Sequence, residues 1–223
     1  MKLRPSPRVR LCTLGLLLGS SLWLSACAPL VVGGIMGGTA LVATDRRTSG
    51  TQVEDQGIEI KIAARLRDQL GGTVHINVNS YNRVVLLTGE SVTDSDKAAA
   101  EHIAAGVDNV QRVVNEISVG FLSSLGSRSK DLLIASKVKA SLVASNDLIS
   151  NAFDIVVERG DVYLMGRVSE REANRATDLA RSVGGVQKVV KLFEIISEEE
   201  LARIQPAPAP ASAPTSAASA ANL

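Results

Sequence analysis

The sequence predicts an α+β protein in which one αββαβ module occurs twice in tandem. An internal repeat is the main reason: Val85–Gly89 is similar to Val162–Gly166, and Gly106–Val110 is similar to Ser182–Val186. The copies are offset by 76 to 77 residues, which indicates one supersecondary unit used twice. Each copy also combines helical spacing of apolar residues with strand-like alternation. Between an uncharged N-terminal segment and a Pro/Ala-rich tail, about 160 residues remain, enough for two small domains.

Each copy opens with a helix that has one apolar face. Its apolar positions recur every four residues: Ile58, Ile62 and Leu66 in the first copy, and Ile134, Val138 and Leu142 in the second. The similarity of Ile62–Leu66 to Ile134–Val138 sets the offset at 72 in this part of the repeat. We therefore expect a longer loop after this helix in the second copy, and Lys61 as the counterpart of Leu133.

Two strands joined by a tight turn are expected to follow the helix. In the first copy the apolar residues are Val74, Ile76 and Val78, and the polar residues between them are His75, Asn77 and Asn79. Such alternation places the apolar set on the core face and the polar set on the outer face. Asn82-Arg83 and Gly160-Asp161 are the candidate turns before the next apolar run.

The second helix of each copy begins at a capping residue. Ser169 with Glu172 has the pattern of a capping box, and Thr93 with Asp96 is a weaker version of it. The helix is expected to end near Asp108-Asn109 or Gly184-Gly185, because these residues tolerate a left-handed backbone.

A last strand completes each copy, over residues 113–119 and 189–196. Ser197 is a candidate cap for a short closing helix, and the three glutamates after it suit the positive end of the helix dipole.

The N-terminus has the pattern of a bacterial lipoprotein signal. Residues 1–26 combine four basic residues, an apolar run and a small-residue exit, as secretory signal peptides do. The run is too short to span a bilayer, which takes about 20 apolar residues. The exit Leu24-Ser25-Ala26-Cys27 resembles the lipobox, so we expect lipidation of Cys27. An ordinary signal peptide with a chance cysteine is the alternative, but it leaves the sole mature cysteine without a function.

The segments around the two copies are expected to be simple connections. We interpret residues 27–52 as a lipidated, flexible tether, although its small residues could instead pack against a partner face. The first domain then covers 53–122, a linker 123–129 and the second domain 130–197. After the short helix, the tail up to residue 223 consists mainly of Pro, Ala and Ser and is expected to be disordered.

Composition argues against several classes of function. Without residues 1–26 the chain has 20 basic and 23 acidic residues, so no basic excess points to nucleic acid. The two histidines, His75 and His102, stand apart from any metal-ligand spacing and are interpreted as surface residues. No cofactor or metal is expected, and no Ser/His/Asp arrangement can be assembled. An enzyme or metal-binding protein remains the more distant alternative.

The repeated segments resemble the BON domain, a small αββαβ module of bacterial envelope proteins. The strand-to-helix segments Val85–Gly89 and Val162–Gly166 and the glycine-containing segments after the second helices carry the likeness. A lipobox, a tether and two such copies occur in the same order in outer-membrane lipoproteins of this family. The resemblance implies a three-stranded mixed sheet packed on two helices in each domain.

The resemblance also implies a function. Such lipoproteins face the periplasm from the outer membrane and support membrane integrity, and their second BON domain binds anionic phospholipid such as phosphatidylglycerol. They gather at division sites and are linked to the outer-membrane protein assembly machinery. A module that docks on that machinery, with incidental lipid contact, is therefore the alternative function.

The first helix of the second copy is the candidate lipid-binding element. At 100° per residue, Leu133 projects away from the apolar face of the expected helix over residues 130–143. The expected contact set is Leu132, Leu133, Lys130, Lys137 and Lys139. An apolar wedge among lysines suits anionic headgroups, and this helix is also the family's lipid-contacting helix. Packing of Leu133 on the first copy or on the tether is the alternative.

Overall fold

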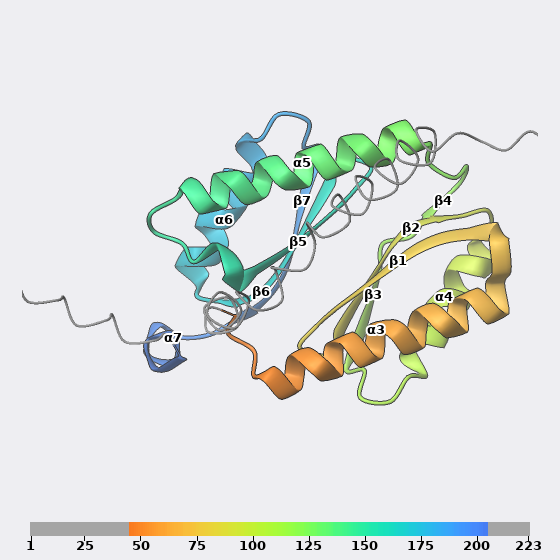
Figure 1. Cartoon of the computed structure of the whole chain (residues 1–223), viewed down its shortest axis with the longest axis horizontal. Coiled ribbons are helices and arrows are strands. Elements are labelled where there is room, and N and C mark those ends of the chain that lie inside the picture. Colours follow the sequence, from red (N-terminus) through yellow and green to blue (C-terminus); the bar gives the residue numbers. More distant parts are fainter. Residues whose placement is uncertain (1–44, 205–223) are drawn as a thin grey trace, which may run out of the picture. The chain divides into compact units, whose positions relative to one another are not determined.

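The computed structural model describes residues 45–204 of the 223-residue chain (Figure 1). Cys27, the expected signal segment and the tail after residue 204 lie outside the described residues. Within them the predicted α+β fold with two αββαβ repeats is confirmed.

The first repeat contains two long helices and a mixed sheet. Its elements are α3 (Ser49–Leu70), the 3₁₀ turn η3 (Gly71–Thr73), β1 (Val74–Tyr81), β2 (Val84–Ser91), α4 (Asp94–Ala105), β3 (Arg112–Asn115) and β4 (Ser118–Val119). The central strand β2 is antiparallel to β1 and parallel to both β3 and β4. The single last strand expected here is thus two short ones, since Ile117 leaves the ladder between them and packs into the core.

The second repeat has the same order of elements. They are α5 (Leu125–Ala144), η4 (Ser150–Ala152), β5 (Phe153–Glu158), β6 (Asp161–Val168), α6 (Glu170–Ser182) and β7 (Lys188–Ile195). The central strand β6 is antiparallel to β5 and parallel to β7. The expected closing helix is α7 (Glu198–Ile204), and the hydroxyl of Ser197 accepts a hydrogen bond from the backbone N–H of Glu200.

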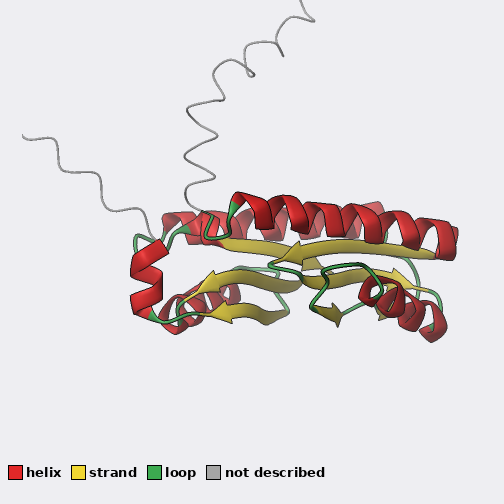
Figure 2. Ribbon diagram, turned by 90° about the horizontal axis from the view of Figure 1, so that it is seen from below, coloured by secondary structure: helices red, strands yellow, loops and turns green. Residues whose placement is uncertain are grey.

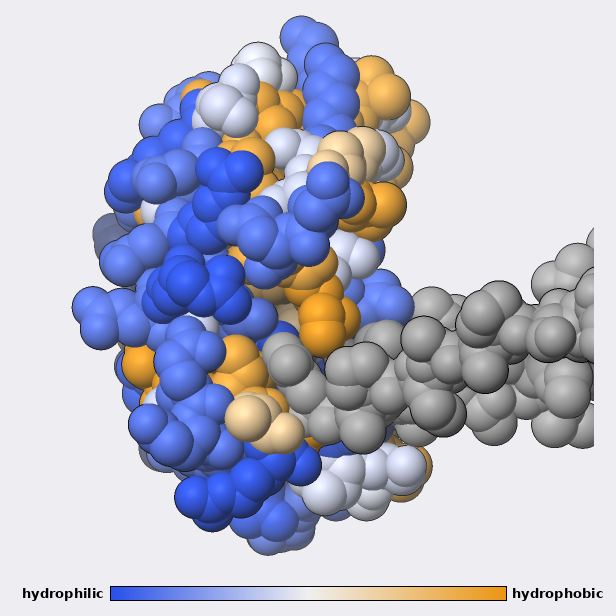
Figure 3. All heavy atoms as spheres, turned by 90° about the vertical axis from the view of Figure 1, so that its left-hand side faces the viewer, coloured by the Kyte–Doolittle hydropathy of each residue, from blue (hydrophilic) through white to orange (hydrophobic). Residues whose placement is uncertain are grey.

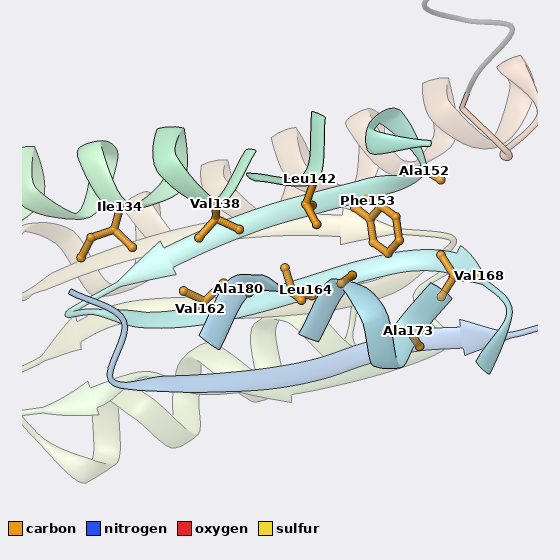
Figure 4. Close-up of a cluster of buried hydrophobic side chains, with 11 residues drawn as sticks. Ile134, Val138, Leu142, Ala152, Phe153, Val162, Leu164, Val168, Ala173 and Ala180 are labelled. Carbon is orange, nitrogen blue, oxygen red and sulfur yellow. The ribbon is translucent and has the colours of Figure 1, made fainter. Parts of the chain in front are cut away.

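Each repeat has its own hydrophobic core between its sheet and its two helices. In the second repeat, Ile134, Val138 and Leu142 project from α5 toward the side chains of the sheet (Figure 4). Short alanine side chains of α6 close the same core, which lets that helix approach the strands. The predicted apolar faces of both first helices are confirmed, because all six of their residues are buried.

The buried faces of α3 and α5 correct the alignment of the repeats. In chain order they are Asp55, Ile58, Ile62 and Leu66 in α3 and Asp131, Ile134, Val138 and Leu142 in α5. Each pair is 76 residues apart, so the predicted offset of 72 is wrong. Eight residues separate α5 from β5 and three separate α3 from β1, so the longer loop expected in the second copy is confirmed. Leu133 corresponds to Gly57 rather than to Lys61.

A buried aspartate in each first helix holds the hairpin turn of its repeat. The carboxylate of Asp55 accepts hydrogen bonds from the backbone N–H groups of Asn82 and Arg83, both at 2.8 Å. Asp131 does the same for Arg159 and Gly160, at 3.0 and 2.9 Å. All four turn residues have positive φ, which a two-residue hairpin turn requires. The second turn therefore lies one residue earlier than the predicted Gly160-Asp161.

The glycine of the repeated motif is required by a close backbone approach. Gly89 in β2 has φ +107°, and a Cβ atom there would lie 2.0 Å from the carbonyl oxygen of His75 in β1. At Gly166 in β6 the corresponding distance to the carbonyl oxygen of Ala152 is 2.5 Å. Both distances are far inside van der Waals contact, so only glycine fits these positions.

The outer faces of the two sheets pack on each other. Tyr81 and Leu86 of the first repeat form one cluster with Tyr163 and Met165 of the second. The backbone N–H of Arg167 donates to the Tyr81 hydroxyl at 3.2 Å across this contact. Figure 2 shows the strands in the interior and helices above and below them. The face expected to point outward is therefore an interface between the repeats.

The connecting segments contain more structure than predicted. Residues 45–52 of the expected tether are not a flexible connection: Arg46 is 8% exposed, and α3 already begins at Ser49. The guanidinium of Arg46 binds both carboxylate oxygens of Glu172, at 2.7 and 2.8 Å. Glu172 also completes the predicted capping box with Ser169, which is confirmed. Burial of this ion pair is what fixes the segment to the second repeat.

The expected linker over residues 123–129 is also mostly helix. The helix begins at Leu125 because the hydroxyl of Ser124 accepts a hydrogen bond from the backbone N–H of Ser127, as an N-cap does. The start expected at Lys130 is therefore five residues too late.

Candidate membrane-contacting surface

Helix α5 has one face buried against the sheet and one face exposed to solvent. The stripe on the sheet comprises Asp131, Ile134, Val138 and Leu142. Leu133 precedes Ile134 in the sequence but lies outside this stripe, and it is 61% exposed. This exposure agrees with its predicted projection away from the core.

Leu133 lines a hollow on the surface of the second repeat, which we call the α5 hollow. It has a volume of about 700 Å³ and lies between the N-terminal half of α5, the segment before it and the turn that precedes β7. Lys130 and Lys137 line the same hollow. The structure thus brings together three of the five side chains expected to contact lipid.

Further apolar side chains that the sequence reasoning missed gather at this place. Phe121 and Leu122 line the α5 hollow, and Phe121 is 97% exposed. Leu125, in the first turn of α5, is 80% exposed. The apolar residues Phe121, Leu122 and Leu125 stand together in the sequence. This run is the signal in the sequence, although the expected domain bounds place it at the end of the first domain and in the linker.

The electrostatics of the α5 hollow favour an anion. Asp131 is the only acidic residue between positions 121 and 144. Its carboxylate is turned into the fold, where it holds the turn at Arg159 and Gly160. The half-exposed guanidinium of Arg159 lines the hollow as a third cation, 3.9 Å from a carboxylate oxygen of the buried Glu90.

The other two expected contact residues lie elsewhere. Leu132 is 70% exposed, but it lines a groove next to α3 rather than the α5 hollow. The ammonium group of Lys139 donates to the carbonyl oxygen of Ser150 at 2.7 Å, and burial lowers its pKa. A lysine held in this way is not free to approach a headgroup, so Lys139 is not part of this surface.

The end of the molecule where α5 finishes has a different character. Arg167 pairs with Glu194 and Glu200, and Arg175 pairs with Asp147. In Figure 3, hydrophilic side chains cover most of this face, and hydrophobic ones form small patches between them. The start of α5 therefore gathers several exposed apolar side chains with three cations, whereas the end of the helix exposes Val143 beside salt-bridged surfaces.

The two histidines lie in different elements of the first repeat. His75 lies in β1 and is half-buried rather than on the surface as expected, and burial, with a contribution from Arg128, lowers its pKa. His102 is exposed near the end of α4. Between residues 45 and 204, no three His, Cys, Asp or Glu side chains are grouped so that they could hold a metal ion. Within the same range, no helix is long and apolar enough to cross a bilayer.

Comparison with known proteins places these features in a family. Residues 54–120 and 130–197 both match the BON domain. The chain is 36% identical over 186 residues to the outer membrane lipoprotein DolP of Haemophilus influenzae, which covers 82% of this chain and 95% of that protein. It is 36% identical over 154 residues to a 21 kDa hemolysin of Actinobacillus pleuropneumoniae, covering 68% and 79%. It is 29% identical over 145 residues to the osmotically inducible protein Y of Escherichia coli, covering 63% and 72%.

The resemblance drawn from the repeated segments is confirmed by these matches. Both αββαβ repeats fall within the matched ranges, and the similarity to the first relative extends beyond them. The relationship also confirms the expected location at the outer membrane. The chain belongs to the BON-domain family, as a two-domain homologue of the outer-membrane lipoprotein DolP.

Proposed function

We propose that this lipoprotein is non-enzymatic and binds anionic phospholipid through the α5 hollow of its second BON domain. Through this contact it supports the integrity of the outer membrane, at division sites in particular. Cys27 would supply the permanent anchor, and α5 a second, reversible contact. The anchor would strengthen the weaker contact, because it raises the effective concentration of α5 at the membrane.

One observation carries the proposal: exposed apolar side chains stand beside lysines on the free side of a helix that is otherwise packed. Phe121, Leu125 and Leu133 are each more than half exposed. An apolar side chain that leaves water contributes about 1.5–3 kcal/mol when fully buried. A lysine near an anionic surface adds about 1 kcal/mol. Lys130 and Lys137 can therefore direct the apolar residues toward an anionic surface and away from a neutral one.

The test uses residues 28–223, which lack Cys27 and so report the protein contact alone. Sedimentation with phosphatidylglycerol vesicles should bring down the wild type, and phosphatidylcholine vesicles should not. Leu133→Asp should weaken binding at least about tenfold, because it places a carboxylate among anionic headgroups. Val143→Asp is the matched control: Val143 lies on the same helix, is 62% exposed and lines a different hollow. It should bind like the wild type.

Three other outcomes would contradict lipid binding through the α5 hollow. Equal losses in Leu133→Asp and Val143→Asp would mean that a carboxylate anywhere on α5 disturbs binding. Binding that ignores both substitutions would separate lipid contact from the α5 hollow. Absence of binding to either vesicle would favour the alternative, in which the second domain docks on a protein of the assembly machinery.

A further inference from the structure

A groove separate from the α5 hollow runs between α3 and α5. Its volume is about 680 Å³, and its floor consists of residues from β1 and β5. Figure 1 shows these two strands between the two helices. In each sheet they are the outermost strands: β1 pairs only with β2, and β5 pairs only with β6. The floor is therefore made of two sheet edges.

The floor exposes backbone as well as side chains. Five consecutive residues of β1, His75 to Asn79, line the groove, as do four of β5, Ile155 to Glu158. Neighbouring residues of a strand point to opposite faces of the sheet, so a cavity against one face touches every second residue. Contact with consecutive residues means that the groove lies along the edge of the strand.

The hairpin geometry identifies which backbone groups face the groove. The turn at Asn82 and Arg83 makes Tyr81 and Val84 the last pair of the β1–β2 ladder. Groups that point to the partner strand alternate with groups that point away. Ser80 points away, since its N–H donates to Glu59 of α3 at 2.7 Å. By the same alternation, the N–H and C=O groups of Ile76 and Val78 face the groove, where the described residues supply no strand to pair with them.

The walls of the groove are apolar in part and negatively charged in sum. Ile60 of α3 is 63% exposed and lines one wall, opposite Leu132 of α5. The charged lining residues are Glu59, Asp131, Glu158 and Arg128. Burial raises the pKa of both Glu59 and Glu158, and nearby carboxylates raise each further. Three carboxylates and one guanidinium line the groove, so its positive charge does not balance its negative charge.

We propose that this groove binds an extended, basic segment of a partner protein, which pairs with β1 as an added strand. Ile76 and Val78 would supply main-chain hydrogen bonds, and every second side chain of the segment would lie against Ile60 and Leu132. Basic side chains between them would approach Glu59 and Glu158. Strand addition to a free sheet edge is a general mode of peptide recognition. Five residues of β1 correspond to about 16 Å of extended peptide.

The test uses the full-length protein in detergent and a seven-residue fluorescent peptide of alternating valine and lysine. The peptide should bind, and hydrogen exchange at Ile76 and Val78 should slow in its presence. Ile60→Lys should weaken binding at least about tenfold, because it replaces an apolar contact by a repelling charge. Val53→Lys is the control, since Val53 is on the same helix, is 71% exposed and does not line the groove. It should leave binding unchanged.

Two further peptides separate strand pairing from charge attraction. A version with methyl groups on alternate backbone nitrogens, those that face β1, should not bind. A version with glutamate in place of lysine should bind at least about tenfold more weakly. Equal binding of the methylated peptide, unchanged exchange at Ile76 and Val78, or equal losses in Ile60→Lys and Val53→Lys would each overturn the proposal. Absence of any binding at about 1 mM peptide would do so as well. Vesicle binding through Leu133 is independent of every one of these results.

Discussion

The first helices of the two repeats, α3 and α5, bury similar side chains but expose different ones. With the offset of 76 residues, Glu54, Gly57 and Lys61 of α3 correspond to Lys130, Leu133 and Lys137 of α5. Glu54 pairs with Arg83 at 2.7 Å, whereas the second repeat has Gly160 in the place of that arginine. The fold constrains the side that holds the turn and the core. It leaves the other side free to become polar in one repeat and apolar and basic in the other.

The largest expected effect concerns the second helices, which are capped differently. The box of Ser169 and Glu172 is buried under Arg46, while the cap at Thr93 of the first repeat is exposed. Arg46→Ala should lower the free energy of unfolding by about 3–5 kcal/mol, because it leaves the Glu172 carboxylate buried and unpaired. Thr93→Ala should cost about 1 kcal/mol. Urea unfolding at pH 7 measures both.

A double substitution checks the cause of the loss. Arg46→Met with Glu172→Met removes both charges and should recover part of the stability lost in Arg46→Ala. Similar losses in Arg46→Ala and Thr93→Ala would show that the segment before α3 is not held to the second repeat in solution.

Replacing Asp55 should destabilise the protein more than replacing Asp131, the aspartate that holds the other turn. Asp55 accepts hydrogen bonds from the Ser80 hydroxyl at 2.8 Å and from Arg47 at 2.9 Å, in addition to the turn amides. Asp131→Ala should cost about 1–3 kcal/mol through the two turn hydrogen bonds. Asp55→Ala should cost at least about 1 kcal/mol more, since it also removes the acceptor of the Ser80 hydroxyl and one of the two carboxylate partners of Arg47. Thermal unfolding of the two variants side by side would show whether this order is correct.

The lipid-binding residues of α5 can be copied onto the corresponding positions of α3. Glu54→Lys with Gly57→Leu gives α3 the charges and the leucine of α5, and Gly57 has open space around its Cβ position. In the Leu133→Asp background, this pair should restore part of the lost binding to phosphatidylglycerol vesicles, up to about tenfold. Lys61, already in place, serves as the second cation. No recovery would mean that Phe121 and Leu125, which α3 lacks in its surroundings, are needed as well.

The smallest effect concerns a carboxylate between the repeats. Burial raises the pKa of Glu158 above its ordinary value of 4.5, and Glu90 contributes to the rise. A raised pKa favours folding when the group is protonated, so this contribution is complete below about pH 4.5 and is lost as the pH rises through the folded-state pKa. Glu158→Gln should therefore raise the free energy of unfolding at pH 7 by less than about 1 kcal/mol. The gain should disappear near pH 4, which a pH series of unfolding curves would check.

Several parts of the fold could be predicted from the residues because their causes are local. The stripe at Ile134, Val138 and Leu142, the capping box at Ser169 and the short helix after Ser197 depend on spacing and on neighbouring side chains. The offset of the first helices was predicted wrongly for the same reason. A four-residue slip keeps an apolar stripe in register, so local similarity could not distinguish 72 from 76. The buried contacts of Asp55 and Asp131 with their turns are what settle it.

The candidate surface was predicted only in part. Spacing on one helix correctly placed Lys130, Leu133 and Lys137 together. It could not show that Lys139 bonds to Ser150 or that Leu132 faces the first repeat. It also assigned Phe121 and Leu125 to a domain end and a linker, because an apolar run is recognised as exposed only when the surrounding fold is known.

The two-repeat α+β organisation and the export and lipidation pattern before Cys27 can be recognised without a structure. These rest on periodicity, capping chemistry and short motifs, which act over a few residues. Three features emerge only from the folded chain: the outer faces of the two sheets meet, Arg46 is buried against Glu172, and the edges of β1 and β5 lie along one groove. Each of these depends on residues tens of positions apart, and contacts at such separations follow from how the elements pack and not from any local pattern.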